Sequence, residues 1–156
     1  MGHLRLSDEE AMALALAQAQ RAGSAGEVPV GAVLLGADGR LLASAHNQRE
    51  GDGDPVAHAE VLALRRAAAA LGRWRLTDTT LVVTLEPCPM CAGALVAARV
   101  ARVVFGAFDH KAGACGSLYN LCCDPRLNHE VEVIGGIDAP RCASVLATFF
   151  AGRRNR

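Results

Sequence analysis

The stretch TLEPCPMCAGALV, residues 84–96, places two cysteines, Cys88 and Cys91, between a run typical of a strand and a run typical of a helix. The run before them, TLVVTL at 80–85, is almost continuously apolar, as expected for a central buried strand. The run after them begins with PMCAGALVAARV at 89–100 and predicts a helix. Taken alone, the cysteine pair fits a metal site, a redox dithiol or part of a disulfide framework.

Strand and helix patterns alternate on both sides of this junction. It is preceded by a helix capped by Ser7 (7–21), two strands joined by a hairpin turn (28–35 and 40–46), a loop (51–55) and a helix (57–72). It is followed by a strand (101–107), a long loop (109–129), a strand (131–136) and a closing helix (139–154). The order predicts an α/β fold of three layers, α/β/α, with helices on both faces of a five-stranded mixed sheet. We see no repeat or linker and expect a single domain over 1–156.

Composition limits the environment and the partners of the chain. Basic and acidic residues both number 16, so the net charge is zero and a nucleic-acid contact must come from a local cluster. No apolar run reaches the roughly 20 residues that cross a bilayer, so we expect no membrane partner. The acidic N-terminal segment does not resemble a signal peptide, which predicts a cytoplasmic location with reduced thiols and argues against a disulfide framework.

A second motif, HAE at residues 58–60, completes a chemical group with the cysteines. His58 and the cysteine pair are predicted at helix starts, where N–H groups and the helix dipole favour thiolate over thiol. Two thiolates and an imidazole nitrogen are typical zinc ligands, and three protein ligands leave a fourth position for water, as in catalytic sites. The sequence therefore predicts one Zn²⁺ held by His58, Cys88 and Cys91.

Glu60 lies two residues after His58, close to the predicted metal without being needed as a ligand. Zinc lowers the pKa of a bound water to roughly 7, and a carboxylate here can take the water proton and pass it to a leaving nitrogen. We therefore predict Glu60 as the catalytic residue of a hydrolytic deamination, since H-x-E followed by P-C-x-x-C is the known signature of zinc nucleobase deaminases. A redox dithiol would leave His58 and Glu60 unexplained.

From about Ser7 to Arg154, the chain resembles the bacterial tRNA-specific adenosine deaminases, which have the cytidine-deaminase-like fold. The resemblance rests on the segments at 27–34, 54–65, 80–95, 102–118 and 127–136, among which 103–118, VVFGAFDHKAGACGSL, points to the tRNA enzymes. It implies conversion of the wobble adenosine of a tRNA anticodon to inosine. It also implies one zinc ion per subunit, a tRNA anticodon stem-loop as partner and a homodimer.

The resemblance further implies which residues contact the substrate. Val30 and the backbone of Ala59 are expected to line the pocket, and Asn47 matches an asparagine that hydrogen-bonds the flipped base. Asp109 and Lys111 match positions that contact the anticodon-loop backbone. From the sequence alone, Asn47 fits a turn equally well, and Lys111 fits a solvated surface position. The arginine-rich end GRRNR (152–156) offers phosphate-binding charge, although such ends are more often simply solvated.

Departures from the family pattern concern the RNA contacts rather than the zinc group. His46 stands where many members carry tryptophan, and Cys115 replaces a small residue. We expect Cys115, Cys122, Cys123 and Cys142 to be buried small hydrophobes, because adjacent cysteines lack the spacing of a second metal site.

Two other functions stay open at this point. A zinc deaminase of a free base or nucleoside, such as guanine or cytosine, would carry the same motifs, and the net charge of zero favours it mildly. It would need a lid that seals the pocket, whereas an RNA enzyme needs an open cationic rim built from residues 105–118 and the closing helix. A catalytically silent partner subunit would be expected to lose the carboxylate of Glu60.

Overall fold

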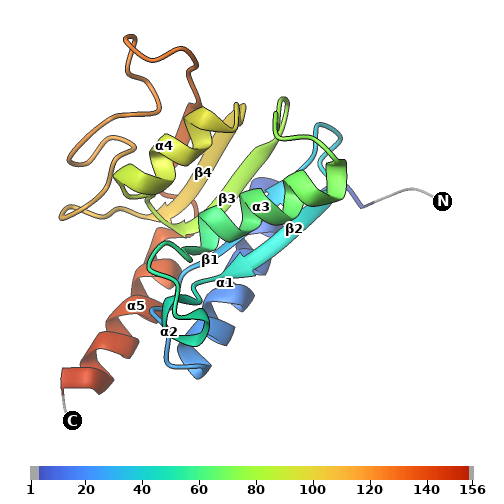
Figure 1. Ribbon diagram of the computed structural model, residues 1–156. Helices are drawn as coiled ribbons and strands as arrows, with labels where there is room; N and C mark the ends of the chain where they lie inside the picture. The colour runs from blue at the N-terminus through green and yellow to red at the C-terminus, as the bar shows by residue number, and fades with distance from the viewer. Residues whose placement is uncertain (1–3, 155–156) are drawn as a thin grey trace.

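In the computed structural model, which describes residues 4–154, the fold is built around a five-stranded mixed sheet (Figure 1). The strands lie in the order β2-β1-β3-β4-β5, with β3 in the middle as the sequence predicted. β1 is antiparallel to both of its neighbours, whereas β3, β4 and β5 are parallel to one another. The bounds are Gly31–Leu35 for β1, Leu41–His46 for β2, Thr80–Leu85 for β3, Arg102–Ala107 for β4 and Glu132–Gly135 for β5.

Helices cover both faces of this sheet. α1 (Asp8–Ser24) and α5 (Ala139–Arg154) pack on one face, and α3 (Ala59–Leu71) and α4 (Pro89–Ala97) pack on the other (Figure 1). The one-turn helix α2 (Arg49–Asp52) lies between β2 and α3. This arrangement confirms the predicted three-layer α/β/α fold.

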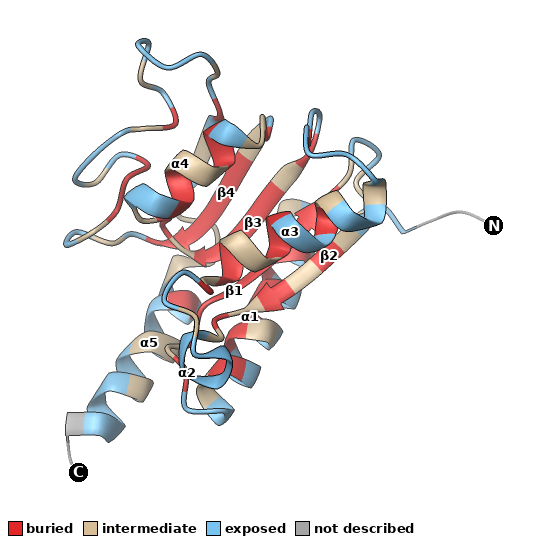
Figure 2. Ribbon diagram, in the orientation of Figure 1, coloured by how far each residue is buried: buried red, intermediate tan, exposed pale blue. Residues whose placement is uncertain are grey.

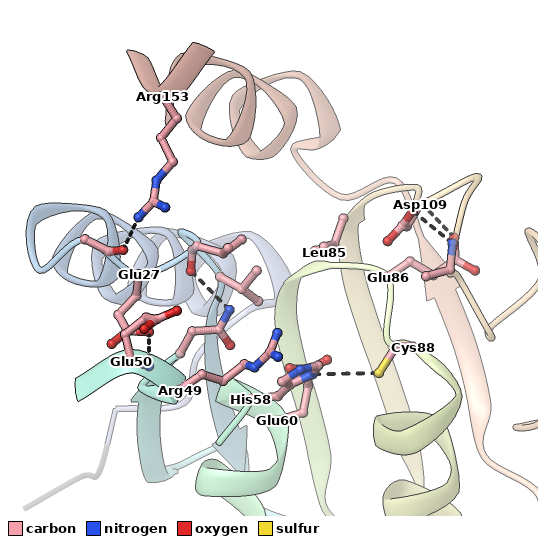
Figure 3. A pocket seen from close by; sticks show the side chains of 15 residues that line it. Glu27, Arg49, Glu50, His58, Glu60, Leu85, Glu86, Cys88, Asp109 and Arg153 are labelled. Carbon is pink, nitrogen blue, oxygen red and sulfur yellow. Dashed lines mark hydrogen bonds between the residues drawn. The ribbon is translucent and has the colours of Figure 1, made fainter. Parts of the chain in front are cut away.

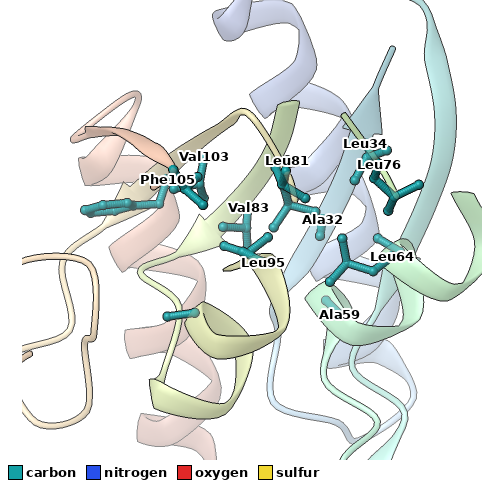
Figure 4. Packing of buried hydrophobic residues seen from close by; sticks show 14 of the residues in the cluster. Ala32, Leu34, Ala59, Leu64, Leu76, Leu81, Val83, Leu95, Val103 and Phe105 are labelled. Carbon is teal, nitrogen blue, oxygen red and sulfur yellow. The ribbon is translucent and has the colours of Figure 1, made fainter. Parts of the chain in front are cut away.

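The central strand β3 shows how the sequence sets the layers. Leu81 and Val83 belong to the hydrophobic cluster under α3 and α4 (Figure 4), and Val82 belongs to the cluster under α1 and α5. Successive side chains of a strand point to opposite faces. Because both faces are covered, the run at 80–85 is buried almost throughout, as the burial colouring of the sheet shows (Figure 2).

Element boundaries differ from the predictions where tertiary contacts intervene. The predicted strand at 28–35 begins only at Gly31, because the N–H of Val30 donates to the carbonyl of Val28 (2.8 Å) in a tight turn. The predicted loop at 51–55 begins inside α2. There the carboxylate of Glu27 accepts the N–H groups of Glu50 (3.1 Å) and Gly51 (2.7 Å), which stabilises this turn of helix.

The structure also bears on the membrane and cysteine expectations. Within residues 4–154, no helix combines the length and the apolarity needed to cross a membrane. All six cysteines are free thiols, and Cys115, Cys122 and Cys142 are buried as predicted. The prediction for Cys123 was wrong: its side chain is exposed, because it lies in a turn whose inward-facing position is taken by Cys122.

Helix α1 packs so closely against β1 that Gly31 leaves no room for a side chain. A Cβ at this position would overlap the backbone of Ala15 and Ala19 in α1. We expect Gly31→Ala to lower the free energy of unfolding by about 1–3 kcal/mol, the usual cost of overpacking, measured by urea denaturation. The control is Gly93 in α4, which has open space around it, so Gly93→Ala should keep or raise stability. Equal losses in both variants would contradict the close packing.

Candidate active site

Three side chains with metal-binding atoms meet where α3 and α4 begin. The ring nitrogen of His58 and the sulfur atoms of Cys88 and Cys91 all lie within 4.8 Å of one another. His58 Nδ1 is 3.7 Å from Cys88 Sγ and 3.4 Å from Cys91 Sγ (Figure 3 shows the His58–Cys88 contact). The structure therefore brings together the three residues that the sequence predicted as zinc ligands.

Local structure explains this convergence. His58 is the N-cap residue of α3, and Cys88 is the N-cap residue of α4, with Pro89 fixing the first helical position. Only Glu86 and Pro87 separate Cys88 from the end of β3, so the cysteine pair lies directly at the carboxyl end of the central strand. Because α3 and α4 cover the same face of the sheet, their first residues meet.

The chemistry of this group fits zinc. Hydrogen bonds from Cys91 and His58 lower the pKa of Cys88 to about 4, so this sulfur is readily a thiolate. The contact with Cys88 in turn raises the pKa of His58. One imidazole nitrogen and two sulfur atoms form a donor set that zinc prefers, and no fourth histidine, cysteine or carboxylate joins it among the described residues.

Glu60 lies in the first turn of α3, beside this group. Its side chain is 4% exposed and lines the same pocket as His58 and Cys88. Burial raises the pKa of Glu60, because a desolvated carboxylate holds a proton more readily. A buried acid next to a metal-ligating group, outside the ligand set, is suited to proton transfer.

A cavity of about 290 Å³ opens above these residues (Figure 3). It is lined by His58, Glu60 and Cys88 together with three of the residues that the resemblance pointed to, Val30, Asn47 and Asp109. The volume is at the small end of ligand pockets and suits one planar base rather than a larger molecule.

Asn47 and Ala59 are tied to each other. The side chain of Asn47, 7% exposed, accepts a hydrogen bond from the N–H of Ala59 (2.9 Å) and donates one to the carbonyl of Val28 (3.1 Å). Ala59 is fully buried and lies behind the pocket lining, with its N–H committed to Asn47. The amide nitrogen of Asn47 keeps a second hydrogen for a ligand in the cavity.

Asp109 and Lys111 differ in their relation to the cavity. Asp109 is half-buried and lines it, and its Oδ1 accepts the N–H groups of Lys111 (3.0 Å) and Ala112 (3.2 Å). Lys111 is exposed and lies beside the cavity, outside its lining. In the predicted basic end at 152–156, Arg153 lines the cavity and donates to the carbonyl of Gly26, whereas residues 155 and 156 lie outside the described part of the chain.

Sequence reasoning missed several residues of the lining. Arg49 and Glu50 belong to α2 and precede the predicted loop at 51–55, and Glu27 and Glu86 are buried acids. An acid directly before the Pro-Cys pair was the one signal available for Glu86. Glu27 carried none, because its partners lie 23 and 24 residues further along the chain.

We expect Cys88→Ala to lose zinc and thermal stability together, because the metal joins the starts of two helices. Metal analysis of the purified protein should fall from about one zinc ion per chain to near zero, with a lower melting temperature. Cys123→Ala, which changes an exposed cysteine outside the group, should retain the metal. A folded Cys88→Ala protein with a full complement of zinc would contradict this ligand set.

Comparison with known proteins places this geometry in a family. Residues 6–107 match the model of the cytidine and deoxycytidylate deaminase zinc-binding region. The chain is 50% identical over 149 residues to a tRNA-specific adenosine deaminase of Bacillus subtilis (strain 168), which covers 96% of this chain and 92% of that protein. It is 46% identical over 147 residues to a tRNA-specific adenosine deaminase of Haemophilus influenzae, with 94% and 85% covered.

Solved structures agree with these matches. A structure from a study of A-to-I editing by tRNA:A34 deaminases at the wobble position of transfer RNA superposes with a TM-score of 0.84 at 43% identity, covering 87% of this chain and 98% of that one. A guanine deaminase from Bacillus subtilis is more distant, with a TM-score of 0.64 at 29% identity over 97% and 96% of the two chains. The fold is therefore cytidine-deaminase-like. The chain belongs to the tRNA-specific adenosine deaminase family of zinc-binding deaminases.

Proposed function

We propose that this protein hydrolyses adenosine to inosine at the wobble position of a tRNA anticodon, with residues 1–156 acting as one zinc-dependent deaminase domain. The observation that carries the proposal is the buried carboxylate of Glu60 beside the His58–Cys88–Cys91 group, at a pocket the size of one base. The relatives at 46–50% identity are named for this activity.

The zinc ligands and Glu60 have separate roles in the proposed reaction. His58, Cys88 and Cys91 would hold one zinc ion per chain, which when bound supplies an activated water. Hydrolysis forms a bond between the water oxygen and C6 of adenine and breaks the C6–N bond. Glu60 would hold the proton that the water gives up and deliver it to the amino nitrogen, which leaves as ammonia. Its burial matches this double role, because a raised pKa lets one carboxyl group act first as base and then as acid.

Features of the pocket support an RNA substrate. Val30 offers an apolar contact for the base, and Asn47, which lines the cavity, has a second amide hydrogen that can bind the base. Arg49 and Arg153, both exposed, line the pocket together with the exposed Glu50 and offer positive charge to backbone phosphates. Asp109 and Lys111 are assigned to the flanking backbone. A base from an anticodon loop is already unpaired, so its entry costs little unstacking energy.

Deamination of a free base such as guanine is the second candidate, favoured by the structural match to a guanine deaminase. Two observations favour RNA: the arginines that line the pocket and the higher identity of the tRNA-specific relatives. A silent partner subunit is disfavoured, because Glu60 is present and buried beside the ligand group.

We also infer a homodimer and a cytoplasmic location. A largely apolar groove runs between α3 and α4, and at one end Trp74 is 55% exposed. Such a surface is typical of a contact between chains. The cytoplasm is the compartment of tRNA and of reduced thiols, in agreement with the free cysteines.

An anticodon stem-loop with a wobble adenosine tests the proposed activity. We expect the purified zinc protein to form inosine in this RNA and to leave free guanine, cytosine and adenosine unchanged, with products identified by nuclease digestion and mass spectrometry. Turnover of a free base with no inosine in the RNA would assign the protein to the second candidate.

The variant Glu60→Gln is the matched control for this experiment. It removes the proton carrier and keeps the ligand set, so zinc content should stay at about one ion per chain while turnover falls by roughly 10²–10⁴-fold. Full activity of Glu60→Gln would contradict the role of this residue even if the RNA is the right substrate.

The dimer is tested by sedimentation equilibrium, which should give twice the mass of one chain. Ala97 is exposed and lines the apolar groove, so Ala97→Glu should shift the protein to monomer by placing a charge in the contact. Ala69→Glu, on an exposed part of α3 outside the groove lining, should remain dimeric. A monomeric wild type would overturn the inference.

A further inference from the structure

Glu86 connects β3 to the cysteine pair, and the proposed chemistry does not use it. Its side chain is 2% exposed, and its carboxylate accepts four hydrogen bonds. Oε1 accepts from the N–H of Asp109 (3.0 Å) and the hydroxyl of Ser117 (2.5 Å), and Oε2 accepts from the N–H groups of Cys115 (3.1 Å) and Ser117 (3.0 Å). All of the donors belong to one loop that follows β4.

This loop, residues 109–117, forms one wall of the pocket through Asp109 and Ala112. Two backbone hydrogen bonds join the last residue of β4 and the middle of the loop to the same short segment. The N–H of Glu86 donates to the carbonyl of Ala107 (2.9 Å), and the N–H of Ala114 donates to the carbonyl of Pro87 (2.8 Å). Glu86 and Pro87, directly before Cys88, therefore connect the segment of the zinc-ligand pair to the loop that forms the pocket wall.

The loop closes around the carboxylate without a gap. A Cβ at Gly113 would overlap both the carboxylate of Glu86 and the carbonyl of Asp109. With both oxygen atoms occupied by two donors each, the Glu86 side chain has no lone pair directed at a substrate, although it borders the pocket. Its influence on a substrate must therefore pass through the loop.

We propose that Glu86 is a positioning residue, which holds the 109–117 loop as the wall of the substrate pocket and fixes Asp109 and Lys111 where the RNA backbone passes. This inference rests on the proposed function, since it concerns the substrate wall of that site. A residue that sets such a wall acts on substrate affinity more than on the chemical step.

Glu86→Gln breaks this arrangement with the smallest change in shape. A glutamine offers one acceptor oxygen, and its NH₂ group faces two of the four donors. Unpaired buried donors are costly, so the loop moves to satisfy them elsewhere. A displacement of about 1 Å in a positioning element can cost up to roughly 10²-fold in activity.

The experiment compares wild type, Glu86→Gln and Ser117→Ala, which loses only the hydroxyl bond. For Glu86→Gln we expect about one zinc ion per chain, faster hydrogen–deuterium exchange in residues 109–117, and a KM for the anticodon stem-loop raised about tenfold or more, with kcat changed less than about threefold. Ser117→Ala should fall between the two. It also keeps the inference testable if Glu86→Gln does not fold.

Asp8→Asn is the control for a purely structural loss. Asp8 pairs with Arg102 (2.7 and 3.0 Å) at the start of β4, at the other end of this strand from the pocket loop. This variant should lower the melting temperature and leave KM and loop exchange unchanged.

Three results would overturn the inference: loss of zinc in Glu86→Gln, unchanged loop exchange and KM, or equal changes in KM for Asp8→Asn. If the wild type does not edit the stem-loop, the proposed function fails, and loop exchange together with zinc content still decides whether Glu86 holds the wall.

Discussion

The meeting of two helix starts at one end of the sheet is the constraint on which the site depends. His58 and Cys88 are N-cap residues of α3 and α4, and these helices cover the same face of the sheet. The two helix starts alone therefore bring one nitrogen and two sulfur atoms within 4.8 Å of one another, and no long loop is needed to position them. Helix N-termini also favour thiolates, so the backbone contributes to the electrostatics of the ligand set as well as to its geometry.

Three buried carboxylates around the pocket do three different tasks, and their hydrogen bonds distinguish them. Glu27 accepts two N–H groups of α2, and Glu86 accepts four donors of the 109–117 loop. These bonds satisfy the buried carboxylate oxygens, so both acids act as fixed structural acceptors. Glu60 is equally buried, but burial dominates its environment and raises its pKa. Glu60, the acid whose burial is least compensated by hydrogen bonds, is therefore the one that lies beside the metal ligands.

The parts of this site that local sequence encodes were predictable, and those that depend on distant partners were not. The ligand residues and Glu60 lie in two short motifs at strand-to-helix junctions, and the apolar run of β3 identifies the central strand. The role of Asn47 could be predicted only in part. It lines the pocket, but it also accepts a hydrogen bond from the N–H of Ala59 and so stabilises the start of α3, which the sequence did not indicate. Glu86 bonds donors 23, 29 and 31 residues away, which no periodicity reveals.

The distribution of charge in the pocket reconciles an RNA substrate with a chain of zero net charge. Buried acids line the interior, so a phosphate entering the cavity would meet like charge and lose its hydration. A neutral base avoids both costs. Arg49 and Arg153 line the pocket from exposed positions, where backbone phosphates remain in water and are attracted without being buried. On the proposed function, selection therefore arises from this separation: the cations hold the RNA backbone at the surface, and the acidic interior admits only a base turned out of its stack.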